Sequence, residues 1–196
     1  MRGLQVVAAA TLGAGLAACA SLSLPTANAL RALDFFNDDM AALLLALDLP
    51  SSVAPVPFGA IVTILATTPA HGERLIEAAL TPADGESVVG TLPPPGRDRA
   101  YYVFGFSDAD KEKLREAQQW GRGLPGGFAA AGGALGIDID PQLCALTGLD
   151  PQTTTFSVLV ALPGGDGLAP LVSNAKLADL LARSGDTELP ACGEDG

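Results

Sequence analysis

The chain has 196 residues, of which 48% are hydrophobic and 17% are charged, and its formal net charge is −11. This length suits one domain with a sizeable core. The acidic balance argues against binding to nucleic acid, whose phosphates would be repelled, and against electrostatic binding to anionic lipid.

The chain begins with an apolar leader. Residues 4–16 carry no charge and follow Arg2. At thirteen residues (16 − 4 + 1) this run is too short for a membrane-spanning helix, which needs about 20. It has the length of the hydrophobic region of a secretory signal peptide, and small residues and a cysteine, Cys19, follow it.

The four residues Leu16, Ala17, Ala18 and Cys19 resemble the lipobox of bacterial lipoproteins: an aliphatic residue, two small residues and a cysteine. The resemblance implies that signal peptidase II recognises the first three and cuts before Cys19. The Cys19 thiol would then carry a diacylglyceryl group, and its freed amine would be acylated.

The residues after Cys19 resemble those of lipoproteins sorted to the outer membrane rather than the inner one, because Ala20 and Ser21 follow and no Asp stands at the second mature position. Two alternatives stay open. The general signal peptidase could cut at the small residues Ala18 and Ala20 in an ordinary secreted protein, or the leader could remain as an uncleaved anchor.

This reading divides the chain into a signal peptide (1–18), a tether (19–25) and a single globular domain (26–196). Without the leader, 10 Lys and Arg stand against 22 Asp and Glu, a net charge of −12 (10 − 22). Lipidation of Cys19 would leave Cys144 and Cys192, which in an oxidising compartment suggest one disulfide. Two free thiols are the alternative.

The domain is predicted to open with a long amphipathic helix that Thr26 caps and Pro50 ends. Its second half, residues 41–47, is apolar nearly all round, which indicates burial or a partner contact. Apolar residues recur at helical spacing: Leu30, Leu33, Phe36, Met40, Leu44 and Leu47.

Residues 51–57 read as a Pro-rich connector, and residues 58–67 as a central strand that is apolar on both faces. Residues 73–80 fit either a second strand, after a hairpin turn at His71 and Gly72, or a helix that begins at Thr68-Pro69. Since Gly72 would weaken the first turn of such a helix, the hairpin is slightly favoured.

Residues 99–106 are predicted as a strand, and residues 108–120 as a surface helix that Ser107 caps. A Gly-rich loop, residues 121–133, follows. Its start, Gly121 to Gly126, matches GxGxxG by letter, but it follows a helix rather than a strand and does not indicate dinucleotide binding.

Residues 135–140 alternate as in a half-buried strand, residues 153–162 form another strand, and a final helix over 174–183 ends at Gly185. The predicted fold class is therefore α+β: a mostly antiparallel sheet with the long N-terminal amphipathic helix and two further helices packed on it.

No set of residues forms a recognisable catalytic pattern. His71 lies at a predicted turn, and no Ser or Cys in a nucleophile-elbow pattern accompanies it. Asp138 and Asp140 share one strand face but lack the Gly and distal Glu of a calcium loop, so a solvated face is favoured. Neither a cofactor nor a metal is expected.

The favoured function is a membrane-anchored cell-envelope lipoprotein that acts as a non-enzymatic interaction or assembly module. Its partners would be the bilayer, through acylated Cys19, and an envelope protein. The alternative is a small periplasmic hydrolase or ligand-binding lipoprotein with a cleft near His71 or the pair Asp138 and Asp140.

Overall fold

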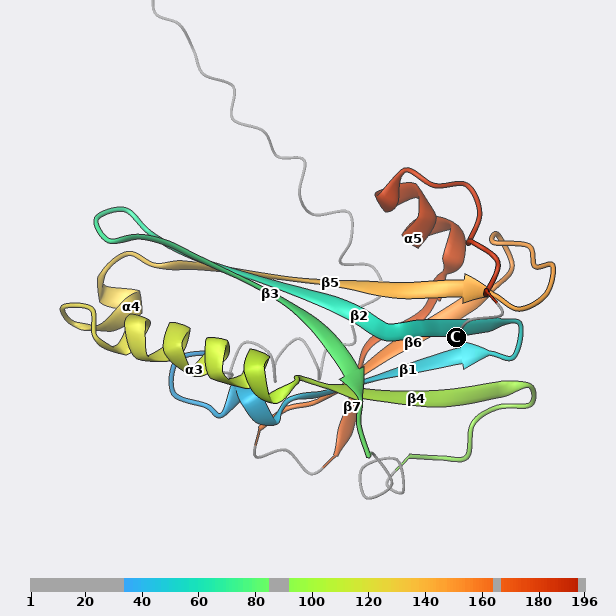
Figure 1. The fold of residues 1–196 in the computed structure, drawn as a ribbon, viewed down its shortest axis with the longest axis horizontal. Coiled ribbons are helices and arrows are strands. Elements are labelled where there is room, and N and C mark those ends of the chain that lie inside the picture. Colours follow the sequence, from blue (N-terminus) through green and yellow to red (C-terminus); the bar gives the residue numbers. More distant parts are fainter. Residues whose placement is uncertain (1–33, 85–91, 164–166, 194–196) are drawn as a thin grey trace, which may run out of the picture.

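The computed structural model describes residues 34–84, 92–163 and 167–193, and they form a seven-stranded antiparallel sheet (Figure 1). The strand order is β5-β2-β3-β4-β1-β6-β7. The strands are β1 (Leu44–Pro50), β2 (Val53–Thr68), β3 (Gly72–Pro82), β4 (Arg99–Gly105), β5 (Ala134–Ala145), β6 (Thr155–Ala161) and β7 (Leu168–Lys176). The helices are the 3-10 turn η2 (Met40–Ala42), α3 (Asp108–Arg122), α4 (Gly127–Ala130) and α5 (Leu177–Ser184).

The predicted fold class is wrong, because among residues 34–84, 92–163 and 167–193 no long N-terminal amphipathic helix packs on this sheet. Residues 40–50 of the predicted helix form η2 and strand β1, and residues 26–33 lie outside the described part of the chain. The apolar run that suggested a buried helix is a central strand instead. Leu45, Leu47 and Leu49 are fully buried between β4 and β6, and a short run that is apolar on all sides does not distinguish the two.

Two further predicted boundaries are corrected. Residues 51–57 are not a connector: Ser51 and Ser52 make a short turn and β2 begins at Val53, with a register shift between Pro55 and Ala60. Residues 174–176 belong to strand β7, so the last helix begins only at Leu177.

Other local predictions are confirmed. Residues 73–80 form strand β3 of a hairpin with β2, whose turn contains Gly72 at φ +79°. Helix α3 begins where Ser107 caps it, since the Ser107 hydroxyl accepts a hydrogen bond from the Asp110 N–H at 3.1 Å. Helix α5 ends at Gly185, in the left-handed conformation.

Part of the sheet projects from the rest. Residues 60–68 of β2 pair with 72–80 of β3 on one side and with 134–141 of β5 on the other. Strand β4 pairs with β3 only at Thr81 and Pro82, so no strand of the described chain pairs with the outer edge of residues 72–80. Figure 1 shows this three-stranded extension, here called the arm, running away from the other strands alongside α3.

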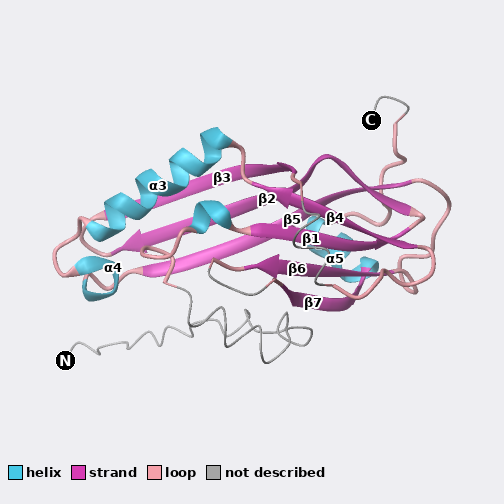
Figure 2. Cartoon of the chain, turned by 90° about the horizontal axis from the view of Figure 1, so that it is seen from below, coloured by secondary structure: helices cyan, strands magenta, loops and turns pink. Residues whose placement is uncertain are grey.

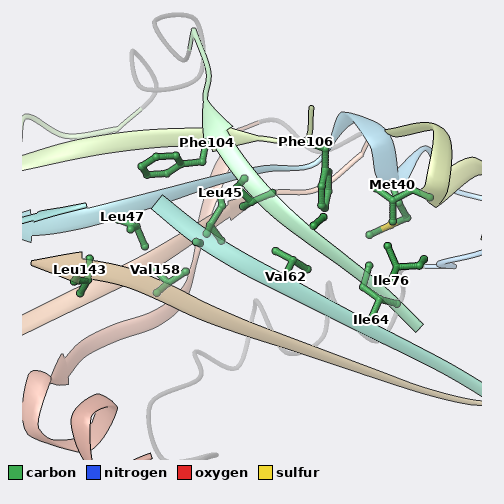
Figure 3. Packing of buried hydrophobic residues seen from close by; sticks show 14 of the residues in the cluster. Met40, Leu45, Leu47, Val62, Ile64, Ile76, Phe104, Phe106, Leu143 and Val158 are labelled. Carbon is green, nitrogen blue, oxygen red and sulfur yellow. The ribbon is translucent and has the colours of Figure 1, made fainter. Parts of the chain in front are cut away.

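One face of the arm is covered. Directly opposed residues of paired strands share a face, so the buried side chains of Val62, Ile64, Ile76 and Ala78 lie on the same side. Helix α3 packs there, and Figure 3 shows Met40 reaching toward Ile64 and Ile76.

The segment before β1 is bound to α3 by polar and apolar contacts. The Gln118 side-chain amide donates to the carbonyls of Phe35 and Asp38, and Arg122 donates to the carbonyl of Phe36. The Phe36 ring lies so close to α3 that only a glycine, Gly121, fits beneath it. These contacts fix the covering layer of the arm.

Electrostatics stabilise the start of α3. Burial raises the pKa of the Asp110 carboxyl, but hydrogen bonds from Lys113 and Ser107 and the Lys113 charge outweigh this, so that the pKa lies below its usual value. The Lys113 ammonium lies 2.7 Å from Asp110 Oδ1. A carboxylate in the first turn also favours the helix dipole.

The body of the sheet is linked across three strands by Arg99 of β4. Its Nε lies 2.8 Å from Asp48 Oδ1 on β1, and its guanidinium also donates to the carbonyls of Asp48 and of Thr155 on β6.

Among the described residues, no helix is both long and apolar enough to cross a bilayer.

Candidate interaction surface

No helix or strand of the described chain covers the second face of the arm. Ile61, Leu65 and Leu75 point to this side and are 37%, 38% and 59% exposed. In register, Leu75 lies opposite Leu65, and Leu65 lies opposite Gly136. This side of the arm, here called the open face, therefore carries aliphatic side chains in contact with solvent.

The open face is also acidic. Glu77 of β3 lies opposite Thr63 of β2, which lies opposite Asp138 of β5, so these side chains form one row across the arm. Asp140 lies in the next row, opposite Ile61. All three carboxylates are on exposed residues, and no ion pair neutralises them within the described chain.

Lysine and arginine are absent from this face. Its side chains come from alternate residues of three strands: Ile61, Thr63, Leu65, Thr67, Glu73, Leu75, Glu77, Ala79, Ala134, Asp138 and Asp140. The nearest basic residue in sequence, Arg74, points to the covered face, where its guanidinium carbon lies 5.2 Å from the centroid of the Trp120 ring.

The predicted disulfide is confirmed and closes one end of β5. Cys144 and Cys192 are bonded, and the tail runs beside β5 in a short parallel bridge between Ala145 and Ala191. The Ala145 N–H donates to Pro190 O at 2.8 Å, and the Cys192 N–H donates to Ala145 O at 2.9 Å. The outer edge of β5 thus already holds a strand-like segment at this end.

Two shallow hollows flank α3. One, of about 460 Å³, lies at the helix start between the ends of β1, β3 and β4, and Gly105, Ser107 and Lys111 line it. The other, of about 600 Å³, lies between the outer edge of β3 and α3, and Arg74 and Trp120 line it.

The structure does not bring the predicted polar candidates together. His71 is exposed at the β2–β3 turn, where its N–H donates to Thr68 Oγ1 at 3.2 Å. Asp138 lies opposite Thr63, which is about 17 Å from Thr68 along β2. Neither His71, Asp138 nor Asp140 lines either of the two hollows. No group of residues suited to a metal ion occurs in the described ranges.

Of the remaining predicted positions, some lie outside the residues that the structure describes and some lie within them. Leu16, Ala17, Ala18 and Cys19 lie outside the described residues. The glycines of the GxGxxG match lie at the end of α3 and in the turn before α4, and no strand precedes them.

The sequence reasoning missed the open face. Residues 58–67 are predicted as a central strand that is apolar on both faces, whereas Ile61 and Leu65 are exposed. The signal that could have revealed them is the alternation of β3, where Glu73 and Glu77 mark a solvent-facing side that Leu75 shares.

Comparisons with protein-family models, curated proteins and solved structures find no match to this chain. Its function is therefore argued from its own residues.

Proposed function

We propose that this chain is a cell-envelope lipoprotein, anchored through acylated Cys19, whose folded domain is a non-enzymatic module that binds an envelope protein. The single observation that carries the binding role is the open face, on which Ile61, Leu65 and Leu75 remain exposed beside carboxylates. Apolar side chains grouped on one surface and bordered by polar residues are typical of interaction sites.

The proposed anchor restricts the partners available to this surface. Each buried CH₂ of an acyl chain contributes about 0.8 kcal/mol, and two or more chains hold a protein stably on a bilayer. The described chain begins at Asp34, fifteen positions after Cys19 (34 − 19). At most about 50 Å of extended chain could therefore lie between the lipid and the domain.

The charge of the open face indicates the class of partner. Glu77, Asp138 and Asp140 would be repelled by an anionic lipid surface or by nucleic acid. A protein surface that presents basic and aliphatic side chains complements both features of this face. The residues after Cys19 favour the outer membrane as the place of contact.

The proposal is tested by photo-crosslinking in the native host. A photoreactive amino acid replaces Leu65 on the open face or, as the control, Arg183, which is exposed on α5. We expect a discrete crosslinked envelope protein from position 65, none from position 183, and loss of the product in a Cys19→Ser chain. Equal crosslinking from both positions, or an undiminished product after Cys19→Ser, would contradict the proposal.

A further inference from the structure

In the arm, the outer edge of β3 borders the hollow beside α3, and the two end strands of the sheet, β5 and β7, differ in how well each could accept a further strand. β7 pairs with β6 through two register shifts and contains Asn174 at φ +51° and Pro170, features that disrupt an edge. In β5, residues 134–141 pair with β2 without interruption. The irregularity between Pro55 and Ala60 adds residues to β2, whereas their partners on β5, Leu143 and Pro141, are two residues apart as in a regular strand.

Backbone groups on the outer edge of β5 alternate. At one end of the strand, Ala145 directs both its N–H and its C=O outward, to Pro190 and Cys192, whereas the N–H of Leu146 points inward, to Ser52 O. Because successive residues of a strand point their backbone groups to opposite sides, the odd-numbered residues face outward.

This alternation places three N–H donors and three C=O acceptors, all without a strand partner in the described chain, on the free part of the edge. Leu135, Ile137 and Ile139 direct their N–H and C=O groups away from β2, and no strand pairs with them among the described residues. Pro141, which has no N–H, follows at the next outward position. The free stretch, residues 134–140, spans about 20 Å, enough for a strand of ordinary length.

The side chains along this edge specify what a further strand would carry. Leu135 and Ile137 point to the covered face of the arm but are 39% and 47% exposed. Asp138 and Asp140 point to the open face and have no basic partner there. An added strand would therefore meet aliphatic groups on one side and carboxylates on the other.

We propose that residues 134–140 of β5 bind an extended segment of a partner protein in which aliphatic residues alternate with Lys or Arg. The backbone groups of Leu135, Ile137 and Ile139 pair with the segment, as Ala145 already pairs with the tail. Its basic side chains lie against Asp138 and Asp140. This deepens the proposed function and rests on it for the statement that the partner is a protein.

A second copy of the chain fits this edge less well. If Ile137 of one copy lay opposite Ile137 of the other, each Asp138 would lie opposite a Gly136, and the aspartates of both copies would gather on one face. No basic residue of the open face would offset them. Charge complementarity thus favours a different, basic segment.

The test uses the full chain, purified in detergent, and a fluorescently labelled, end-capped octapeptide of alternating Val and Lys. In an antiparallel arrangement, the Val residues lie opposite Leu135 and Ile137, so the Val N–H groups are those that bond to β5. We expect saturable binding by fluorescence anisotropy, at least tenfold weaker when the Val nitrogens are methylated and unchanged within twofold when the Lys nitrogens are methylated. Equal effects of the two methylations would overturn backbone pairing.

The charge contribution is tested with matched variants. Asp138→Asn combined with Asp140→Asn should weaken peptide binding at least tenfold and reduce its salt dependence. Glu112→Gln combined with Glu116→Gln removes the same charge from exposed positions of α3 and should change affinity less than twofold. If both double variants weakened peptide binding equally, the peptide would be attracted only by the overall negative charge of the protein, and the proposal would be overturned.

Two outcomes separate this inference from the proposed function. If the protein sedimented as a dimer and Ile137→Asp dissociated that dimer, the edge of β5 would bind a second copy of the chain, and the inference would be overturned. Absence of peptide binding, together with an intact crosslink from position 65, would also overturn it but leave the interaction module standing.

Discussion

Reduction of the bond between Cys144 and Cys192 should destabilise the protein strongly. The two residues are 48 apart in sequence, so the bond closes a loop that contains β6, β7 and α5. Loop-closure entropy for this length gives about 4 kcal/mol as an upper value. For a chain of this size, that corresponds to a melting temperature lower by about 8 to 16 °C.

The assay is urea unfolding followed by circular dichroism, on the same preparation with and without reductant. This comparison breaks the bond without substituting the buried Cys144 side chain. The double variant Cys144→Ala, Cys192→Ala is the control, because its midpoint should not respond to reductant. Coincident transitions of oxidised and reduced wild-type protein would refute the reasoning.

Three further predictions concern positions in the covering layer and the body of the sheet. Gly121→Ala places a methyl group against the Phe36 ring and should cost about 1 to 3 kcal/mol, with faster proteolysis of residues 34–43 as the readout. Asp110→Asn should cost about 1 kcal/mol at pH 7 in urea unfolding. The pKa of Asp110 is lower in the folded than in the unfolded protein, so the stability difference between wild type and Asp110→Asn is fully present above about pH 4, the unfolded pKa. It should vanish as the pH falls through the folded pKa. A difference that stays constant down to pH 2 would contradict this prediction. Arg99→Ala should lower the free energy of unfolding in urea by about 2 kcal/mol. Arg99→Lys should restore less than half of that loss, because an ammonium cannot make all three contacts of the guanidinium. Full restoration by lysine would show that the charge alone matters.

Local signals in the sequence predicted several elements well. Ser107 with Asp110 marks the start of α3, Gly185 marks the end of α5, and a glycine at a turn separates β2 from β3. Each of these signals acts through the residue's own backbone or a hydrogen bond within four residues. Such features are independent of the rest of the fold and can be read from a short stretch.

The fold class could not be predicted because it depends on distant neighbours. Leu44 to Leu49 becomes a strand since β4 and β6, which follow much later in the chain, pair with it on both sides. Its apolar residues fit a buried helix equally well when considered alone. Likewise, Asn174 to Lys176 belongs to a strand because residues 155–156 of β6 pair with residues 175–176.

The cysteine pairing was predictable by counting, whereas the open face is signalled only by the alternation of β3. With lipidation expected at Cys19, only Cys144 and Cys192 are left to pair. The exposure of Leu65, in contrast, results from what fails to pack against the arm, and no local pattern in residues 58–67 encodes this. Figure 2, which views the chain from below, shows α3 running beside β3 and α4 lying near the arm ends of β2 and β5.

The central claim, that a lipid on Cys19 holds this domain at a membrane, is tested most directly by mass spectrometry of the N-terminus of protein isolated from the native envelope. We predict a chain that begins at Cys19 and carries the mass of a diacylglyceryl group and an amide-linked acyl chain. A chain that begins at any other residue, or one without lipid mass, would contradict the account.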